Sequence, residues 1–158
     1  MSRIARFFPA ALMMLTALTG TTQPCKRDLH QAAELWRRGL LQKASSLLEP
    51  GFECLKRNSA DLLLSSQIHL DANRMELAEK GFLHLYQKGY KPRICLRALA
   101  EISHHRLRFR EAIHFYKELY AHLKKNDPAR NEIINKINAC VLGIQHSKAE
   151  PLAWVESL

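Results

Sequence analysis

The chain has 158 residues, of which 47% are hydrophobic and 25% are charged. This length suits one domain that can bury a core, and the composition excludes a chain that is disordered throughout. The formal net charge of +9 favours an anionic partner or surface, whether a membrane, an acidic peptide or a nucleic acid.

Residues 1–22 have the order of segments found in a secretory signal peptide. Arg3 and Arg6 precede the apolar run Phe7–Leu18, and small polar residues follow it. The run is shorter than the ~20 apolar residues that a membrane-spanning helix needs. We therefore expect an exported chain without a transmembrane span, and export argues against a nucleic-acid partner. The alternative is an extra amphipathic helix docked on the domain, which Pro9 disfavours.

Cys25 follows this segment, where a bacterial lipoprotein would carry its acylated cysteine. Gln23 and Pro24 precede it, whereas a lipobox has an apolar residue and then small ones. We expect an unanchored chain in the periplasm or associated with the outer membrane, with lipid on Cys25 as the less favoured alternative.

The first predicted helix pair occupies about residues 25–58. Asp28–Arg38 has apolar residues at helical spacing, and Gly39 ends that helix. A second helix runs from about Leu40 to Glu49, where Pro50 and Gly51 break it. The next two pairs occupy about residues 59–92 and 93–126. Their four helices are expected at Ala60–Ala72, Met75–Lys88, Pro92–His105 and Phe109–Lys125.

A single closing helix is predicted over residues 128–145, because Asp127 and Pro128 are typical of a helix start. We expect three isoleucines to face inward and three asparagines outward, as in a solubilising end cap. Residues 147–158, which include Trp154, have no helical period and are predicted to be irregular. The inward set is Ile133, Ile134 and Ile137, and the outward set is Asn131, Asn135 and Asn138 together with Lys136.

One interval of 34 residues organises the helices. Ala44, Ala78 and Ala112 lie 34 apart (78 − 44 = 34; 112 − 78 = 34), and each is followed four residues later by a large apolar residue. Small residues also recur twelve positions before each alanine. Such spacing is typical of helix pairs that touch through small residues, and it predicts an all-α array of three helical hairpins plus a C-terminal capping helix. The large residues are Leu48, Phe82 and Tyr116, and the second small set is Ala32, Ser66 and Ala100.

With its 34-residue period and its A-x3-[F/Y/L] pattern, the stretch over roughly residues 25–126 resembles the tetratricopeptide repeat (TPR) family. The resemblance implies a TPR-like repeat domain over residues 25–146 that binds peptides or partner domains in its concave groove. The sequence departs from the family pattern at the turns, where Gly39 is replaced by Asn73 and Leu107 in the later repeats.

A narrower resemblance concerns the end of the chain. Ile137–Cys140, Ala149–Pro151 and Glu156–Leu158 are similar to the junction in Bacteroidota outer-membrane proteins where a TPR region precedes a PD40-type β-propeller and an OmpA-like domain. This resemblance implies a place in envelope-anchoring or secretion machinery. It implies no peptidoglycan-binding activity here, because the residues for that activity are absent from the sequence.

The expected function is a non-enzymatic protein–protein interaction module of the bacterial cell envelope, with a protein or peptide partner of acidic character. The alternative is a structural spacer, or a truncated remnant of a larger secretion-system protein, whose groove stays empty. First-helix positions beside the buried stripe are projected to line the concave face and to bind the partner. They are Trp36, Arg37, Gln67, Asp71, Arg97, Glu101, His104, Asn131 and Asn135.

Cysteine and histidine chemistry leaves some alternatives open. A helix hairpin would bring Cys25 and Cys54 close together, either as a disulfide or as free thiols. Cys95 and Cys140 are interpreted as buried small hydrophobes. His69, His104 and His105 are interpreted as solvated or groove-lining rather than as metal ligands.

No metalloprotease, redox or nucleophile motif is present, so we expect no enzyme, metal or cofactor. The basic run from His104 to Arg110 is either a solvated turn or an anion contact at the rim of the groove.

Overall fold

The computed structural model describes residues 23–149, and the regular structure within them is helical. The prediction of an all-α fold is confirmed for this part of the chain. No helix among these residues has the length and apolar character needed to cross a bilayer. The predicted signal peptide at residues 1–22 and Trp154 lie outside the described residues.

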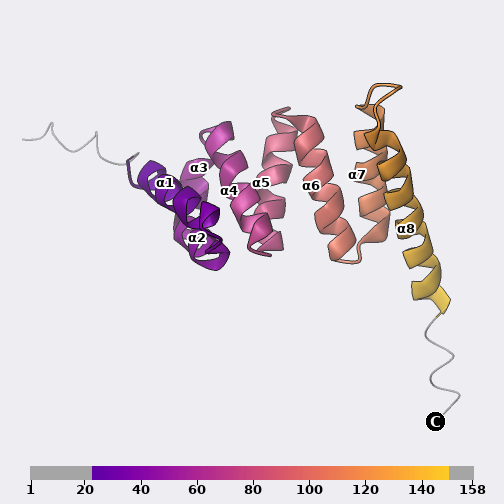
Figure 1. Ribbon diagram of the computed structural model, residues 1–158, viewed down its shortest axis with the longest axis horizontal. Coiled ribbons are helices and arrows are strands. Elements are labelled where there is room, and N and C mark those ends of the chain that lie inside the picture. Colours follow the sequence, from indigo (N-terminus) through magenta and orange to yellow (C-terminus); the bar gives the residue numbers. More distant parts are fainter. Residues whose placement is uncertain (1–22, 150–158) are drawn as a thin grey trace, which may run out of the picture.

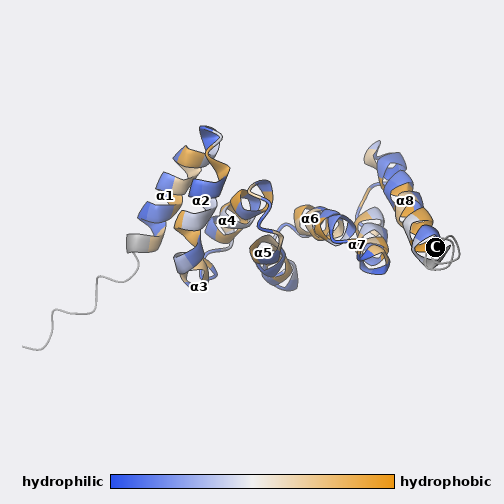
Figure 2. Ribbon diagram, turned by 90° about the horizontal axis from the view of Figure 1, so that it is seen from below, coloured by the Kyte–Doolittle hydropathy of each residue, from blue (hydrophilic) through white to orange (hydrophobic). Residues whose placement is uncertain are grey.

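The helices stand side by side in a row that runs from α1 to α8 (Figure 1). Within the row, α1 packs against α2, α4 against α5, and α6 against α7, while α5 contacts α6 and α7 contacts α8. Both hydrophobic and hydrophilic residues occur on the helices (Figure 2), as expected where one face is buried. The helices are α1 (Gln23–Arg37), α2 (Leu41–Leu48), η1 (Glu49–Gly51), α3 (Phe52–Leu55), α4 (Ser59–Asp71), α5 (Met75–Gln87), α6 (Pro92–His105), α7 (Phe109–Ala121) and α8 (Ala129–Ala149).

The turns inside the three pairs have one backbone geometry. Gly39, Asn73 and Leu107 have φ of 76°, 58° and 57° and lie 34 residues apart (73 − 39 = 34; 107 − 73 = 34). In each turn the residue that follows the left-handed one donates its backbone N–H to the carbonyl oxygen five residues earlier, as Arg74 N does to His69 O at 2.8 Å. Left-handed φ costs a β-carbon-bearing residue about 1–2 kcal/mol, so the surrounding helices impose this turn on Leu107.

Small residues fill the contact between paired helices. Ala44, Ala78 and Ala112 are fully buried. A β-carbon built on Gly81 of α5 would lie 2.0 Å from Ser66 Oγ on α4, so these two helices approach as closely as a glycine allows. The large residues that follow the alanines at the fourth position are buried beside them. The 34-residue spacing of the sequence therefore marks buried helix contacts.

Three helix ends differ from the prediction by more than one residue. Helix α1 begins at Gln23, five residues before the expected start at Asp28 (28 − 23 = 5). Helix α8 continues to Ala149, four residues past the expected end at Gln145 (149 − 145 = 4), so the start predicted for the irregular tail is wrong. A proline restricts mainly the residue before it, and Pro151 therefore permits helix up to Ala149. Helix α7 stops at Ala121 instead of Lys125.

The predicted orientation of one isoleucine on α8 is also wrong. Ile133 is buried, but Ile134 keeps 40% of its surface exposed. Adjacent residues on a helix point about 100° apart, so both cannot face α7. Asn131, Asn135 and Asn138 are exposed as predicted.

Candidate functional site

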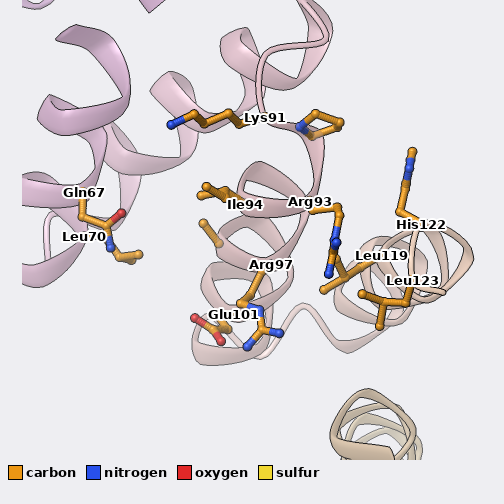
Figure 3. Close-up of a pocket in the computed structure, with 12 residues that line it drawn as sticks. Gln67, Leu70, Lys91, Arg93, Ile94, Arg97, Glu101, Leu119, His122 and Leu123 are labelled. Atoms are coloured by element: carbon orange, nitrogen blue, oxygen red, sulfur yellow. The ribbon is translucent and has the colours of Figure 1, made fainter. Parts of the chain in front are cut away.

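A cavity of about 550 Å³ surrounds the exposed side of α6. The side chains of Arg97 and Glu101 project from α6 between Gln67 and Leu70 on one side and the end of α7 on the other (Figure 3). The walls of the cavity are apolar at Leu70, Pro92, Ile94, Ala98, Leu119 and Leu123, and polar at Gln67, Lys91, Arg93, Arg97, Glu101 and His122.

Of the nine predicted partner-binding residues, the cavity brings together Gln67, Arg97 and Glu101. Ile94 lies beside them with 45% of its surface exposed, which leaves an aliphatic contact open to a ligand. The cavity therefore offers an apolar wall, an amide and both signs of charge. These groups suit an extended peptide segment.

Two of the cavity's cations already have acidic partners. Arg97 lies 3.6 Å from Glu132 of α8, and Arg93 lies 3.1 Å from Asp127. Both pairs are partly exposed, so each is worth little and can be exchanged for a ligand carboxylate at low cost. Lys91 has no carboxylate within ion-pair distance among residues 23–149.

Trp36 and Asp71 lie together, outside the cavity lining. The indole Nε1 of Trp36 donates to Asp71 Oδ2 at 2.7 Å and so links α1 to α4. Arg37 pairs with Glu34 on its own helix. These three residues thus have partners within the chain, and their contacts stabilise the array.

The remaining three predicted residues lie further along the array. His104 contacts Phe109 edge-on, with ring centroids 5.8 Å apart. Burial lowers the pKa of His104, and the charges of Lys136 and His105 lower it further. Asn131 and Asn135 are exposed on α8. None of the three lines the cavity.

The basic run at the α6–α7 turn is engaged by carboxylates. Arg106 lies 2.9 Å from Glu79, and Arg108 lies 2.5 Å from the same carboxylate and 3.0 Å from Glu111. Glu79 belongs to α5, so this network joins the second pair to the third. Arg106 and Arg108 thus have carboxylate partners within the chain, and the choice between a solvated turn and an anion contact stays a prediction.

The cysteines divide into one bonded pair and two separate thiols. Cys25 and Cys54 form a disulfide that ties the start of α1 to α3. Cys95 and Cys140 are buried thiols. Burial raises the pKa of Cys95 to about 11, so that thiol is a poor nucleophile at neutral pH.

His69 is fully buried, and its interpretation as a solvated or groove-lining residue is wrong. Its Nδ1 lies 2.7 Å from Ser45 Oγ, and burial lowers the pKa of its imidazole. Because both side chains are closed to solvent, no substrate reaches the serine. Residues 23–149 contain no cluster of three or more His, Cys, Asp or Glu side chains that could hold a metal ion.

The prediction from the sequence missed most of the cavity. Lys91, Arg93 and Ile94 precede the stretch of α6 that the projection considered, and His122 follows the last residue of α7. The available signal in the sequence was that Ile94 and Cys95 are adjacent apolar residues, which cannot both face the core of one helix.

Comparison with protein-family models, with curated proteins and with solved structures finds no match to this chain.

Proposed function

We propose that this chain is a non-enzymatic protein–protein interaction module with a TPR-like repeat domain. The repeated turn geometry at Gly39, Asn73 and Leu107 supports the TPR-like interpretation, since it recurs at the period of that family. The proposed setting is the bacterial cell envelope, on the basis of the signal-like order of residues 1–22.

The cavity around α6 is the observation that carries this proposal. It joins the apolar surface of Ile94 to the polar groups of Gln67, Arg97 and Glu101 in one hollow. Partner-binding sites combine an apolar anchor with a few placed polar groups in this way.

In the proposed mechanism, an extended segment of the partner lies along α6. An aliphatic side chain of the partner packs on Ile94 and Ala98, and its carboxylate replaces Glu132 at Arg97. The amide of Gln67 can donate to a backbone carbonyl of the partner and accept from a backbone N–H. The cations of the cavity favour an acidic segment.

The alternative function is a structural spacer, or a remnant of a larger envelope protein, with an empty groove. The contacts of Trp36 with Asp71 and of Arg97 with Glu132 favour it, because these polar groups are satisfied within the chain. A spacer would hold neighbours through its ends, for example through α8.

Photo-crosslinking from inside the cavity tests the proposal. Replacing Ile94 with p-benzoylphenylalanine in the full-length chain, in the cells that produce it, places a reactive group on the cavity wall. We expect one reproducible crosslinked partner from this position. The same replacement at Lys117, which is exposed on α7, is the control and should give no such product.

Two side-chain truncations separate the interaction module from the spacer. Gln67→Ala and Arg97→Ala should each lower the crosslinking yield roughly tenfold, as loss of one interfacial polar contact of ~1.4 kcal/mol does. The melting temperature should stay unchanged, since both residues are partly exposed. Crosslinks that arise from Leu142 on α8 but not from Ile94 would reject the groove and favour the spacer.

A further inference from the structure

Five exposed cations lie on the turns that connect one helix pair to the next. These turns join α3 to α4, α5 to α6, and α7 to α8, and they lie along one long edge of the array, uppermost in Figure 1. We call these residues the basic edge. They are Arg57, Lys88, Lys91, Lys124 and Lys125.

Three of the five recur with the period of the array. Arg57, Lys91 and Lys125 are 34 residues apart (91 − 57 = 34; 125 − 91 = 34). Each lies shortly before a helix: Arg57 before α4, Lys91 before α6 and Lys125 before α8, which begin at Ser59, Pro92 and Ala129. The turns that carry these three residues lie along one edge of the array (Figure 1), so the charges lie on that edge.

The basic edge is not neutralised within residues 23–149. Its neighbouring carboxylates hold other cations: Glu53 pairs with Lys56, and Asp127 pairs with Arg93. The five cations themselves have no carboxylate within 4.0 Å in this part of the chain. At the opposite edge, Arg106 and Arg108 share three carboxylates.

Lys91 occupies a position that the fold alone does not favour. It is the N-cap of α6, with φ 45° and ψ 56° and without a side-chain capping bond. Left-handed backbone is costly for lysine, and a positive charge at a helix N-terminus is disfavoured by the helix dipole. By contrast, Asn58 caps α4 with its side-chain oxygen. Helix stability therefore does not account for a lysine here.

We propose that the basic edge binds the anionic surface of a lipid bilayer. A row of cations along a straight side of an elongated molecule can approach a flat surface together, and the attraction needs no fixed geometry. Four of the five residues are lysines, which act as mobile point charges, whereas nucleic-acid recognition favours arginine forks and stacking aromatics. Tyr90 is the aromatic residue nearest in sequence, and it is half-buried with Lys91 Nζ 5.8 Å from its ring centroid.

The expected strength follows from the charges. Each Lys or Arg near an anionic leaflet raises the partition coefficient roughly fivefold, so removing three should lower it on the order of 100-fold. The attraction should also be lost when salt shortens the Debye length to about 4–5 Å near 0.5 M. Lys91 belongs both to this edge and to the cavity, so a bound bilayer would lie beside the proposed peptide groove.

Vesicle flotation with the full-length chain tests the proposal. The edge variant combines Arg57→Gln, Lys91→Gln and Lys125→Gln. The control variant combines Lys43→Gln, Lys80→Gln and Lys117→Gln, which removes the same charge from exposed positions on second helices. Each protein is floated with neutral phosphatidylcholine vesicles and with vesicles that contain roughly 30% phosphatidylglycerol.

The measured quantity is the ratio of the partition coefficients on anionic and neutral vesicles, which removes any charge-independent binding by other segments. We expect this ratio to fall on the order of 100-fold in the edge variant and less than about fivefold in the control. Equal ratios in the two variants, or a ratio near one for the parent chain, would overturn the proposal. If the edge variant does not melt like the parent, the milder variant Lys124→Gln with Lys125→Gln should still lower the ratio about 25-fold.

A nucleic-acid arm uses a fluorescent 20-nucleotide single strand and a matched duplex in the same buffer. Binding to either that depends on the basic edge, without preference for anionic vesicles, would replace the lipid proposal with a nucleic-acid one. This experiment is independent of the groove, because it needs no protein partner.

Discussion

Gly81→Ala should destabilise the protein, although alanine is the better helix former. Gly81 is buried in α5, and a methyl group there would lie 2.0 Å from Ser66 Oγ and 3.1 Å from Ser66 Cβ. Relieving the overlap moves a hydroxyl that donates to Leu62 O at 2.7 Å, or pushes α4 away from α5.

The sign of the effect follows from the magnitudes. Overpacking costs about 1–3 kcal/mol and a lost buried hydrogen bond about 1–3 kcal/mol, against a propensity gain of about 1 kcal/mol. Together these terms give a net loss of about 1–5 kcal/mol, and we use about 2 kcal/mol, from the lower part of that range. With roughly 2.1 cal/mol/K of unfolding entropy per residue over the ordered part, this lowers the melting temperature by about 7 °C.

Urea and thermal unfolding of a double-mutant cycle check this. Adding Ser66→Gly to Gly81→Ala opens space for the new methyl group, so the two changes should be coupled by about 1–2 kcal/mol in the favourable direction. Ser46→Ala, on an exposed site of α2, is the control and should raise stability by a few tenths of a kcal/mol. A Gly81→Ala variant that is more stable than the parent would refute the close contact.

Three further predictions concern the first pair, its neighbour and the turns. Replacing Cys25 and Cys54 with serine removes a disulfide between residues 29 positions apart and should lower the free energy of unfolding by about 3–4 kcal/mol, measured by urea denaturation. The parent protein under reducing agent should unfold at the same urea concentration as this variant. Because burial holds the pKa of His69 below 6.5, its neutral form stabilises the fold fully above that pH, and stability should fall as pH drops through 6.5 toward the lower folded-state pKa. In His69→Leu the urea midpoint should fall less between pH 7.5 and pH 5, and an unchanged slope would contradict the assignment. Gly39→Leu should cost about 1–2 kcal/mol, because φ at Gly39 is 76° and left-handed; a β-carbon there would meet no neighbour, so the backbone alone sets this cost. The reciprocal change Leu107→Gly should be near neutral or slightly stabilising. Equal losses of stability in the two variants would argue against a shared turn geometry.

Helical period was sufficient to locate the helices and their buried positions. Ala44, Ala78 and Ala112 were expected at helix contacts, and all three are fully buried. The helix start at Pro92 was also predicted, because proline is favoured in a first helical turn. These features depend on local spacing and local backbone chemistry.

The helical period of the sequence did not predict which of two adjacent residues would be buried. Ile133 and Ile134 both read as inward-facing, but the packing of α8 on α7 buries only Ile133. His69 was interpreted as solvated or groove-lining, yet it is enclosed between Ser45 and Phe52, and the ring centroids of His69 and Phe52 are 6.1 Å apart. A hydrogen-bond partner favours burial of a polar residue, and the partner of His69 Nδ1 is Ser45 of another helix, α2.

The candidate site was predicted in part for the same reason. The first helices were expected to line a groove, and Gln67, Arg97 and Glu101 line the cavity. The contribution of His122 was not foreseen, since it depends on where α7 ends relative to α6.

The sequence alone therefore determines an all-helical fold for residues 23–149 with a 34-residue period, because hydrophobic spacing, small residues and cap signals act over one or two turns. Tertiary structure decides which polar groups are free to bind. Asp71 is held by Trp36, and Arg106 and Arg108 are held by Glu79, whereas Lys91 remains without a carboxylate partner in the described chain. Those pairings join residues about 30 positions apart, and their geometry depends on how one helix pair sits on the next.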